Sequence, residues 1–298
     1  MVSTDAAEEP VRHTRLVLGL VAAASFAQVV PDPKLRANRN TYSPVLEVIK
    51  PTMGMVTDEQ LEKLKNLQLE PIWQAVQALG YRNCHFSGLK TSRPGERLVG
   101  RALTIRYLPA RPDLAEAMLT LAKEGDWPRA YNVRAAEEVK PGDVIVVDLG
   151  GEISDGIFFG DVSAIGAQTA GAKGVILYGS SRDLQELQKM PGFPVFAMGW
   201  DPKPAVQLGI DWNVPIRVGN VTVLPGDVVV ANDEAAMFFP AKIAGEVIER
   251  ATATQDQEMY ERQLTREKKY RFRDVYPLNP ELKKQYEAEK AKEKQQDK

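Results

Sequence analysis

One short apolar run limits the fold of this chain more than any other feature. The turn at 141–143 (PGD) leads directly into residues 144–148 (VIVVD), where four branched apolar side chains follow one another without alternation. Such a run predicts a strand that is buried on both faces, which is typical of parallel sheets. The chain then alternates between helical and strand patterns, over residues 161–172 (helix), 175–178 (strand), 182–189 (helix) and 194–198 (strand). This order predicts parallel βαβ units.

Further patterns surround this predicted centre. Residues 98–107 predict another strand, with Gly100 as a kink or bulge. Pro71 suits the first turn of a helix, and Gly80 suits its end. Residues 216–223 predict a hairpin around a Gly-Asn pair. The expected fold class is α/β, with parallel βαβ units plus antiparallel hairpins, flanked by helical N- and C-terminal extensions.

The chain divides into four predicted regions: a signal peptide at 1–27, an extended lead-in at 28–57, an α/β domain at 58–250, and a C-terminal helix with a charged tail at 251–298. Arg12 and Arg15 precede the apolar run 16–27, which has the length of a signal-peptide core and is too short to span a bilayer. Acidic residues near the start dilute its positive charge, and a buried helix or an uncleaved anchor is the alternative. We expect export to the periplasm or medium, with no stable membrane span after processing; without such a signal the protein would be cytoplasmic.

The histidine and cysteine counts restrict the chemistry. The chain has two histidines, His13 and His85, and one cysteine, Cys84, so it cannot build a multi-histidine or cysteine-based metal site. Any metal must have oxygen ligands, which favours magnesium, manganese or calcium. Neighbouring residues on a strand face opposite sides, so Cys84 and His85 do not form a nucleophile–base pair. The net charge of −2 gives no reason to expect nucleic-acid binding.

The first candidate loop covers residues 149–163, between the buried strand and the next helix. Backbone N–H groups at the start of a helix can bind a carboxylate or phosphate, and Gly160 would let such a ligand approach closely. Asp161 has an alternative role as the N-cap of this helix. Ser163 is a second candidate for the cap, which would leave Asp161 available for chemistry.

The second candidate loop, residues 178–183 (YGSSRD), lies at the carboxyl end of the following strand. Ligands bind at this edge in open α/β sheets. Arg182 supplies a forked cation that can recognise a carboxylate or an oxyanion, and Asp183 supplies a hard anionic oxygen. Taken alone, the pair is better interpreted as a helix cap beside a surface charge.

Together, the two loops resemble the RraA-like proteins, a family that includes the class II, metal-dependent 4-hydroxy-4-methyl-2-oxoglutarate aldolases. The shared motifs are a PGD turn, a strand ending in Asp, a Gly-Asp helix opening and a strand that leads to Arg-Asp, found here at 141–143, Asp148, Gly160-Asp161 and 174–183. Residues 99–106 also fit the family's Gly-x-Ala-x-Thr strand, and the resemblance covers about residues 60–265. The family usually has Asp where this chain has Tyr178, so the end of this strand lacks a carboxylate.

The resemblance implies a swivelling β/β/α domain in a ring-shaped homotrimer, with active sites at subunit interfaces. It also implies that Asp183 anchors Mg²⁺ or Mn²⁺, to which a small 2-oxo acid substrate would bind. Arg182 would stabilise an enolate oxygen, and Asp161 would hold a water that transfers a proton at the methyl carbon. The substrate carboxylate would be held by backbone N–H groups at the helix start: Gly160, Asp161, Val162 and Ser163. Glu258, on the C-terminal helix, would reach a neighbouring subunit's site or remain a surface residue.

The implied function is a divalent-metal-dependent lyase that cleaves a 4-hydroxy-2-oxo acid, or decarboxylates oxaloacetate, through a pyruvate enolate. Two alternatives stay open. One is a non-catalytic RraA-like protein that regulates a partner by contact, and the other is an exported sugar-acid or lactone enzyme that uses the same metal and arginine. An intact Asp183 favours the lyase over the binding protein.

Overall fold

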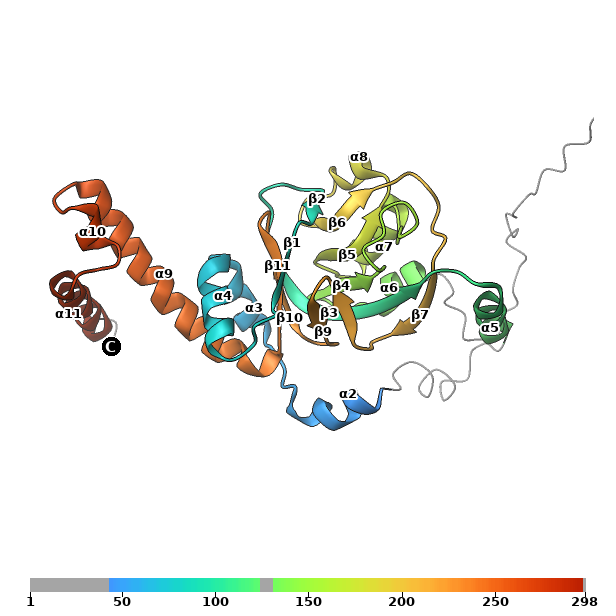
Figure 1. Ribbon diagram of the computed structural model, residues 1–298, viewed down its shortest axis with the longest axis horizontal. Helices are drawn as coiled ribbons and strands as arrows, with labels where there is room; N and C mark the ends of the chain where they lie inside the picture. Colours follow the sequence, from blue (N-terminus) through green and yellow to red (C-terminus); the bar gives the residue numbers. More distant parts are fainter. Residues whose placement is uncertain (1–42, 124–130, 297–298) are drawn as a thin grey trace, which may run out of the picture.

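The computed structural model describes residues 43–123 and 131–296, so the predicted signal peptide and the first half of the lead-in, residues 28–42, lie outside the described residues. Within the described residues, a nine-stranded mixed sheet forms the centre of the domain (Figure 1). Its middle is parallel, and the strands lie side by side in the order β3 (Leu98–Leu108), β4 (Asp143–Asp148), β5 (Gly174–Ser181) and β6 (Val195–Trp200). The predicted parallel βαβ units are therefore confirmed.

The apolar run of β4 is buried on both faces, as its sequence predicts. Residues 144–147 are all 0% exposed. Ile145 and Val147 pack in a cluster with Ala164 and Ala167 of α7 (Asp161–Thr169). On the other face, the remaining two valines of β4 pack with the hairpin of β8 (Ile216–Val218) and β9 (Val221–Val223). The hairpin predicted at 216–223 is thus present, and it covers one face of the sheet.

Helices connect the parallel strands. The connections are α5 (Pro112–Lys123) and α6 (Tyr131–Glu138) between β3 and β4, α7 between β4 and β5, and α8 (Leu184–Leu187) between β5 and β6. The helix predicted at 182–189 is too long, because α8 has only four residues. The chain leaves the helix early since Leu187, Met190 and Phe193 all turn into the same core cluster.

Antiparallel strands extend the sheet on both sides of its parallel centre. On one side lie β10 (Val228–Ala231), β11 (Ala235–Phe239) and β1 (His85–Ser87), and on the other side β2 (Lys90–Thr91) pairs with β6. The second half of β3 pairs with β7 (Leu208–Trp212). The combination of parallel and antiparallel pairing confirms the predicted α/β class.

Gly100 is neither a kink nor a bulge, which corrects the sequence-based prediction. It pairs regularly with Val229 of β10, and the register shift of β3 lies between Arg106 and Tyr107. A side chain at residue 100 would place its Cβ 2.5 Å from the carbonyl oxygen of Gly142. The glycine is needed because the PGD turn passes directly over the strand.

The antiparallel end of the sheet is covered by α3 (Asp58–Lys65), α4 (Leu69–Ala78) and the first part of α9 (Ala244–Glu267), which follows the short η2 (Ala241–Ile243). Pro71 lies in the first turn of α4 and Gly80 follows its end, as predicted. Figure 1 shows that α9 then projects from the domain and carries α10 (Phe272–Val275) and α11 (Pro280–Gln296) at its far end.

Two predicted boundaries differ from the structure. Residue 250 lies inside α9, because this helix begins at Ala244. Part of the lead-in that was expected to be extended is helical, as α2 (Pro44–Ile49) and η1 (Lys50–Thr52). A proline opens each of these two helices, where its fixed φ suits the first turn. Among the described residues, no helix combines the length and apolarity that a bilayer crossing requires.

We expect Asp227→Asn to flatten the pH dependence of stability. Asp227 is 4% exposed, its Oδ2 accepts a hydrogen bond of 2.8 Å from the Leu224 N–H, and burial raises its pKa to about 7. Because the folded chain holds this proton to a higher pH than the unfolded chain does, stability is lost as pH rises from about 4 through 7. Between pH 5 and 8 the unfolding free energy should fall by about 2–3 kcal/mol more in the unmutated protein than in the variant.

Urea titrations across this pH range measure the difference. The slope is the test, because the buried amide of the variant adds a cost that does not change with pH. Identical slopes in the two proteins would show that Asp227 is already ionised in the folded state.

Candidate functional site

The two candidate loops meet at the carboxyl ends of β4 and β5. The loop after β4 is bonded to the end of β5 at several points: the Phe158 N–H donates to the Ser180 carbonyl (3.1 Å), and the Arg182 N–H donates to the Phe159 carbonyl (3.2 Å). Ile157 also forms an isolated parallel bridge with Ser180. These bonds place Gly160, which precedes α7, against Arg182 and Asp183, which precede α8.

Two serine hydroxyls complete this attachment, and the sequence analysis did not assign them a role. Ser180 and Ser181 are both 0% exposed. The Ser180 hydroxyl donates to the Ile153 carbonyl (2.5 Å) and the Ser181 hydroxyl donates to the Phe159 carbonyl (2.9 Å). The signal was present in the sequence as two small polar residues at the end of an otherwise apolar strand.

Gly160 is required by the packing of the site. A Cβ on this residue would overlap the Asp183 carboxylate and lie 2.9 Å from Arg182 Nε. Gly160 is also the N-cap of α7 and, having no side chain, it caps nothing. The missing side chain therefore leaves the space that the Arg182 and Asp183 side chains occupy.

Asp183 has an unusual backbone for a residue with a side chain. It adopts the left-handed conformation, with φ 60° and ψ 37°, which non-glycine residues rarely do. Although it is the N-cap of α8, its side chain makes no capping bond. Its Oδ2 instead lies 3.4 Å from the Asp161 N–H and 3.4 Å from Arg182 Nε. The interpretation of Asp183 as a helix cap is therefore wrong for its carboxylate.

Asp161 and Ser163 do not cap α7 either. Asp161 is the first residue of the helix, and its Oδ1 accepts a hydrogen bond of 2.8 Å from the Val162 N–H. Ser163 accepts a bond of 3.1 Å from the Asn132 side-chain amide. Two of the N–H groups that were expected to hold a substrate carboxylate, those of Asp161 and Val162, are thus held by protein carboxylates. Another anion can reach these two N–H groups only if the Asp161 and Asp183 side chains move away from them.

The donor set fits a hard divalent cation that keeps most of its water. Within the described residues, no three His, Cys, Asp or Glu side chains come together as a metal-binding cluster. Asp183 is 39% exposed and offers an oxygen that capping does not use. Magnesium is commonly held by one or two carboxylates together with water and substrate oxygens. Asp183 fits that mode, and it does not fit a cation held by protein ligands alone.

Tyr178 lies on the opposite face of β5 from the main helix-covered cluster. Its ring makes an edge-to-face contact with Phe86 at 5.5 Å and packs with the hairpin cluster. A Cβ on Gly151 would lie 2.9 Å from this ring. Tyr178 is paired in register with Asp148, whose carboxylate accepts the N–H groups of Gly150 (3.0 Å) and Arg217 (3.2 Å). Where the family usually has a carboxylate, this chain thus has an aromatic ring that packs against the hairpin cluster.

Glu258 lies on the projecting helix α9, in a groove with Glu70 and Arg262. Arg262 Nη2 is 2.6 Å from its Oε2. Burial and the nearby Glu70 carboxylate raise the pKa of Glu258. Figure 1 shows α9 on the far side of the sheet from α7 and α8, so within one chain the structure does not bring Glu258 to the loops that carry Arg182 and Asp183.

Comparison with known proteins finds a family model that matches this chain and several proteins of similar sequence. A family model described as RraA-like, aldolase/RraA, matches residues 68–237. A 4-hydroxy-4-methyl-2-oxoglutarate aldolase of Thermus thermophilus is 30% identical over 113 residues, which are 38% of this chain and 68% of that protein. A relative in Halalkalibacterium halodurans is 33% identical over 135 residues, which are 45% of this chain and 63% of the relative. This chain therefore spans less than two thirds of the second relative.

Solved structures give the same fold. RraAS2 of Streptomyces coelicolor, an unusual member of the RNase ES inhibitor RraA protein family, is 26% identical with a TM-score of 0.59, and the match covers 70% of this chain and 98% of that one. An uncharacterised protein of Pseudomonas syringae has a TM-score of 0.64 at 21% identity, and covers 76% of this chain and 97% of that one. The latter likeness concerns the fold alone.

We expect Gly160→Ala to displace the Asp183 and Arg182 side chains while the fold remains. The three atoms nearest to the added methyl group all belong to the side chains of Asp183 and Arg182, and these side chains can move aside. The loss of their geometry should lower any activity of the site by about 10²-fold. A crystal structure and rate measurements test this.

Gly245→Ala in α9 is the matched control, because its Cβ would meet its nearest neighbour at 3.5 Å, an ordinary contact. It should leave the rate unchanged. Equal rates for Gly160→Ala and the unmutated protein would remove this contact from the site.

Proposed function

Because this chain belongs to the RraA-like family, we propose that it is a divalent-metal-dependent carbon–carbon lyase acting on small 2-oxo acids. The reaction is cleavage of a 4-hydroxy-2-oxo acid or decarboxylation of oxaloacetate, in each case through a pyruvate enolate. The observation that supports this most directly is the placing of Arg182 and Asp183 against the first turn of α7, with Gly160 leaving space for them.

Each group of the site has a separate role in the proposed reaction. A bound Mg²⁺ or Mn²⁺ would polarise the 2-oxo group as a Lewis acid, and Asp183 is the residue that would hold it. Arg182 faces the same space with a planar, permanently charged fork, so it can stabilise the oxygen on which enolate charge develops. The N–H groups of residues 160–163, at the start of α7, bind the substrate carboxylate when the Asp161 and Asp183 side chains move away from them.

The bond changes follow from this arrangement. In cleavage, the 4-hydroxyl gives its proton to the water held by Asp161, C4 becomes a carbonyl carbon, the bond between C3 and C4 breaks, and the electron pair of that bond forms the enolate. In decarboxylation, the electron pair comes from the bond to the departing carboxylate. In both reactions the enolate takes a proton at C3 and becomes pyruvate. Asp161, at the start of α7, holds the water that delivers this proton.

We also propose that the site is completed by neighbouring subunits in a homotrimer. Two apolar side chains on α7 support this, since Val162 is 78% exposed and Ile165 is 51% exposed beside Asp161. Apolar residues grouped on one exposed face are typical of interfaces. Export remains a proposal that rests on residues 1–27.

A non-catalytic role is the second candidate function. It is favoured by the likeness to RraAS2, which belongs to a family of ribonuclease inhibitors by its description. A contact regulator has no need of a half-exposed arginine and carboxylate beside a helix start, so Arg182 and Asp183 favour the lyase. An enzyme for exported sugar acids or lactones would share the same residues and differ in releasing no pyruvate.

Arg182→Ala should lower kcat by about 10²–10³-fold with a smaller effect on KM, because enolate charge is larger in the transition state than in the bound substrate. Arg182→Lys keeps the charge and loses the planar fork, so it should also be strongly impaired. Coupled assays of pyruvate release from oxaloacetate and from 4-hydroxy-2-oxo acids measure both. Rates like those of the unmutated protein in both variants would exclude Arg182 from the chemistry.

Chelation should abolish pyruvate release, and added Mg²⁺ or Mn²⁺ should restore it. Asp183→Asn is the decisive variant, because asparagine tolerates the left-handed backbone that Asp183 adopts. It should fold with an unchanged melting temperature and bind Mn²⁺ at least about 10-fold more weakly, since it lacks the charge. Full activity after exhaustive chelation, or unchanged Mn²⁺ binding by the variant, would contradict the proposal.

A further inference from the structure

We infer that Arg93 and Glu96 are positioning residues that hold Arg182 and Asp183 in place through the turn that follows α8. This inference rests on the proposed function, because it assigns the pair a role in aiming the same site. Neither residue belongs to the two candidate loops. They lie in the segment 92–97, which connects β2 to β3.

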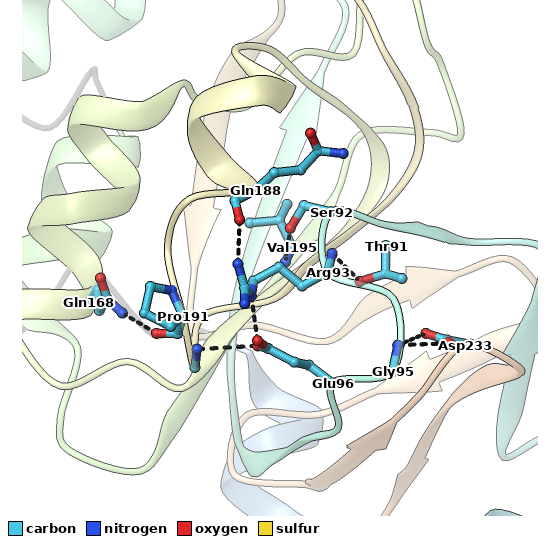
Figure 2. A network of polar contacts seen from close by, with 11 residues as sticks. Thr91, Ser92, Arg93, Gly95, Glu96, Gln168, Gln188, Pro191, Val195 and Asp233 are labelled. Carbon is cyan, nitrogen blue, oxygen red and sulfur yellow. Dashed lines mark hydrogen bonds and ion pairs between the residues drawn. The ribbon is translucent and has the colours of Figure 1, made fainter.

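Arg93 and Glu96 both form hydrogen bonds with the turn of residues 188–192 (Figure 2). Arg93 Nη1 donates to the Gln188 carbonyl at the end of α8, and Arg93 Nε donates to Glu96 Oε1. The other carboxylate oxygen, Glu96 Oε2, accepts a hydrogen bond of 3.2 Å from the Gly192 N–H. One ion pair therefore binds both a carbonyl and an N–H of residues 188–192.

A second contact reaches the same turn from α7. The Gln168 side-chain amide donates to the Pro191 carbonyl at 3.0 Å (Figure 2). The two helices that begin at the candidate site, α7 and α8, are thus tied together where they end. A displacement of residues 188–192 would move α8 relative to α7, and with it the Arg182 and Asp183 side chains relative to Gly160.

Asp183 needs such support for a physical reason. Its left-handed backbone belongs to a region that costs about 1–3 kcal/mol for a non-glycine residue and persists only when the surroundings fix it. The helix that follows is a single turn, which is too short to be stable by itself. Leu187 anchors α8 in the core, and Arg93 with Glu96 holds residues 188–192, which follow this helix.

The ion pair is separable from the general stability of the segment. Ser92 holds β6 by two hydrogen bonds with Val195, of 2.8 and 3.0 Å, and Asp233 accepts the Gly95 N–H at 2.9 Å. These bonds keep the segment in place when the Glu96 carboxylate is removed. The side chains of Arg93 and Glu96 are 22% and 28% exposed, so water screens their contact less than that of a fully exposed pair.

The test compares Glu96→Ala, Glu96→Gln and Arg93→Lys with the matched control Asp233→Ala, all in the full chain. Asp233 holds the same segment at Gly95, and none of its hydrogen bonds reaches residues 188–192. Amide hydrogen exchange of residues 186–192 and the Asp183 Cα chemical shift report the geometry. Pyruvate release reports kcat and KM, and thermal unfolding reports stability.

In Glu96→Ala we expect exchange of the Gly192 amide to accelerate about 10-fold, as for a lost hydrogen bond, and the Asp183 Cα shift to move. We expect kcat to fall by about 10²-fold, as for a misplaced catalytic group, with KM changed less than about threefold. Glu96→Gln keeps an acceptor oxygen and should recover much of the rate. Arg93→Lys cannot bind both Gln188 and Glu96, so it should resemble Glu96→Ala. The control should match the unmutated protein in rate and in exchange.

Each other outcome overturns the inference. Faster exchange with an unchanged kcat would mean that the pair holds the turn without aiming the site. Unchanged exchange would mean that other contacts hold the turn. A loss of kcat as large in Asp233→Ala as in Glu96→Ala would indicate a general structural effect. If the unmutated protein releases no pyruvate, the proposed function fails, and the Asp183 Cα shift in Glu96→Ala then decides the positioning role alone.

Discussion

The parallel pairing of β4 with β5 is the constraint on which the rest of the structure depends. It fixes the carboxyl ends of the two strands side by side, with Asp148 opposite Tyr178. The loops that leave these ends therefore have to pack on each other, and the buried hydroxyls of Ser180 and Ser181 fasten them together. Burial of residues 144–147 on both faces makes the pairing rigid, because helices and a hairpin enclose β4.

The rigid strands hold unfavourable features together at the site, namely two neighbouring carboxylates and a strained backbone. Asp161 and Asp183 bring two carboxylates to the first turn of α7, where helix N–H groups and Arg182 offset their repulsion. Asp183 also carries a strained backbone. Such strain and like-charge proximity are typical of functional sites, where they are maintained by the surrounding fold. A cation held by Asp183 would offset the repulsion between the two carboxylates.

The sequence predicted the centre of the fold, because continuous burial and βαβ alternation are visible in one chain, whereas only the family resemblance implied that the two loops share one site. It did not predict the reason for Gly100, since only the folded structure places the PGD turn over β3. The length of α8 was predicted wrongly because Leu187 and Phe193 pack into a core cluster whose other members lie far away in the sequence, so the local pattern does not reveal it. For the same reason, nothing in the spacing of Arg93 and Glu96 points to their partners Gln188 and Gly192, which lie 95 and 96 residues further along the chain. The αL backbone of Asp183 was likewise invisible, because Asp is compatible with ordinary caps.

The central claim is that Arg182 and Asp183 support a pyruvate enolate. Exchange of the pyruvate methyl protons for deuterium, followed by proton NMR in D₂O, tests it without knowledge of the natural substrate. With Mg²⁺ or Mn²⁺ present, the unmutated protein should exchange these protons well above the rate of metal and buffer alone, and Asp183→Asn should not. Exchange no faster than that of the buffer with either cation would contradict the account.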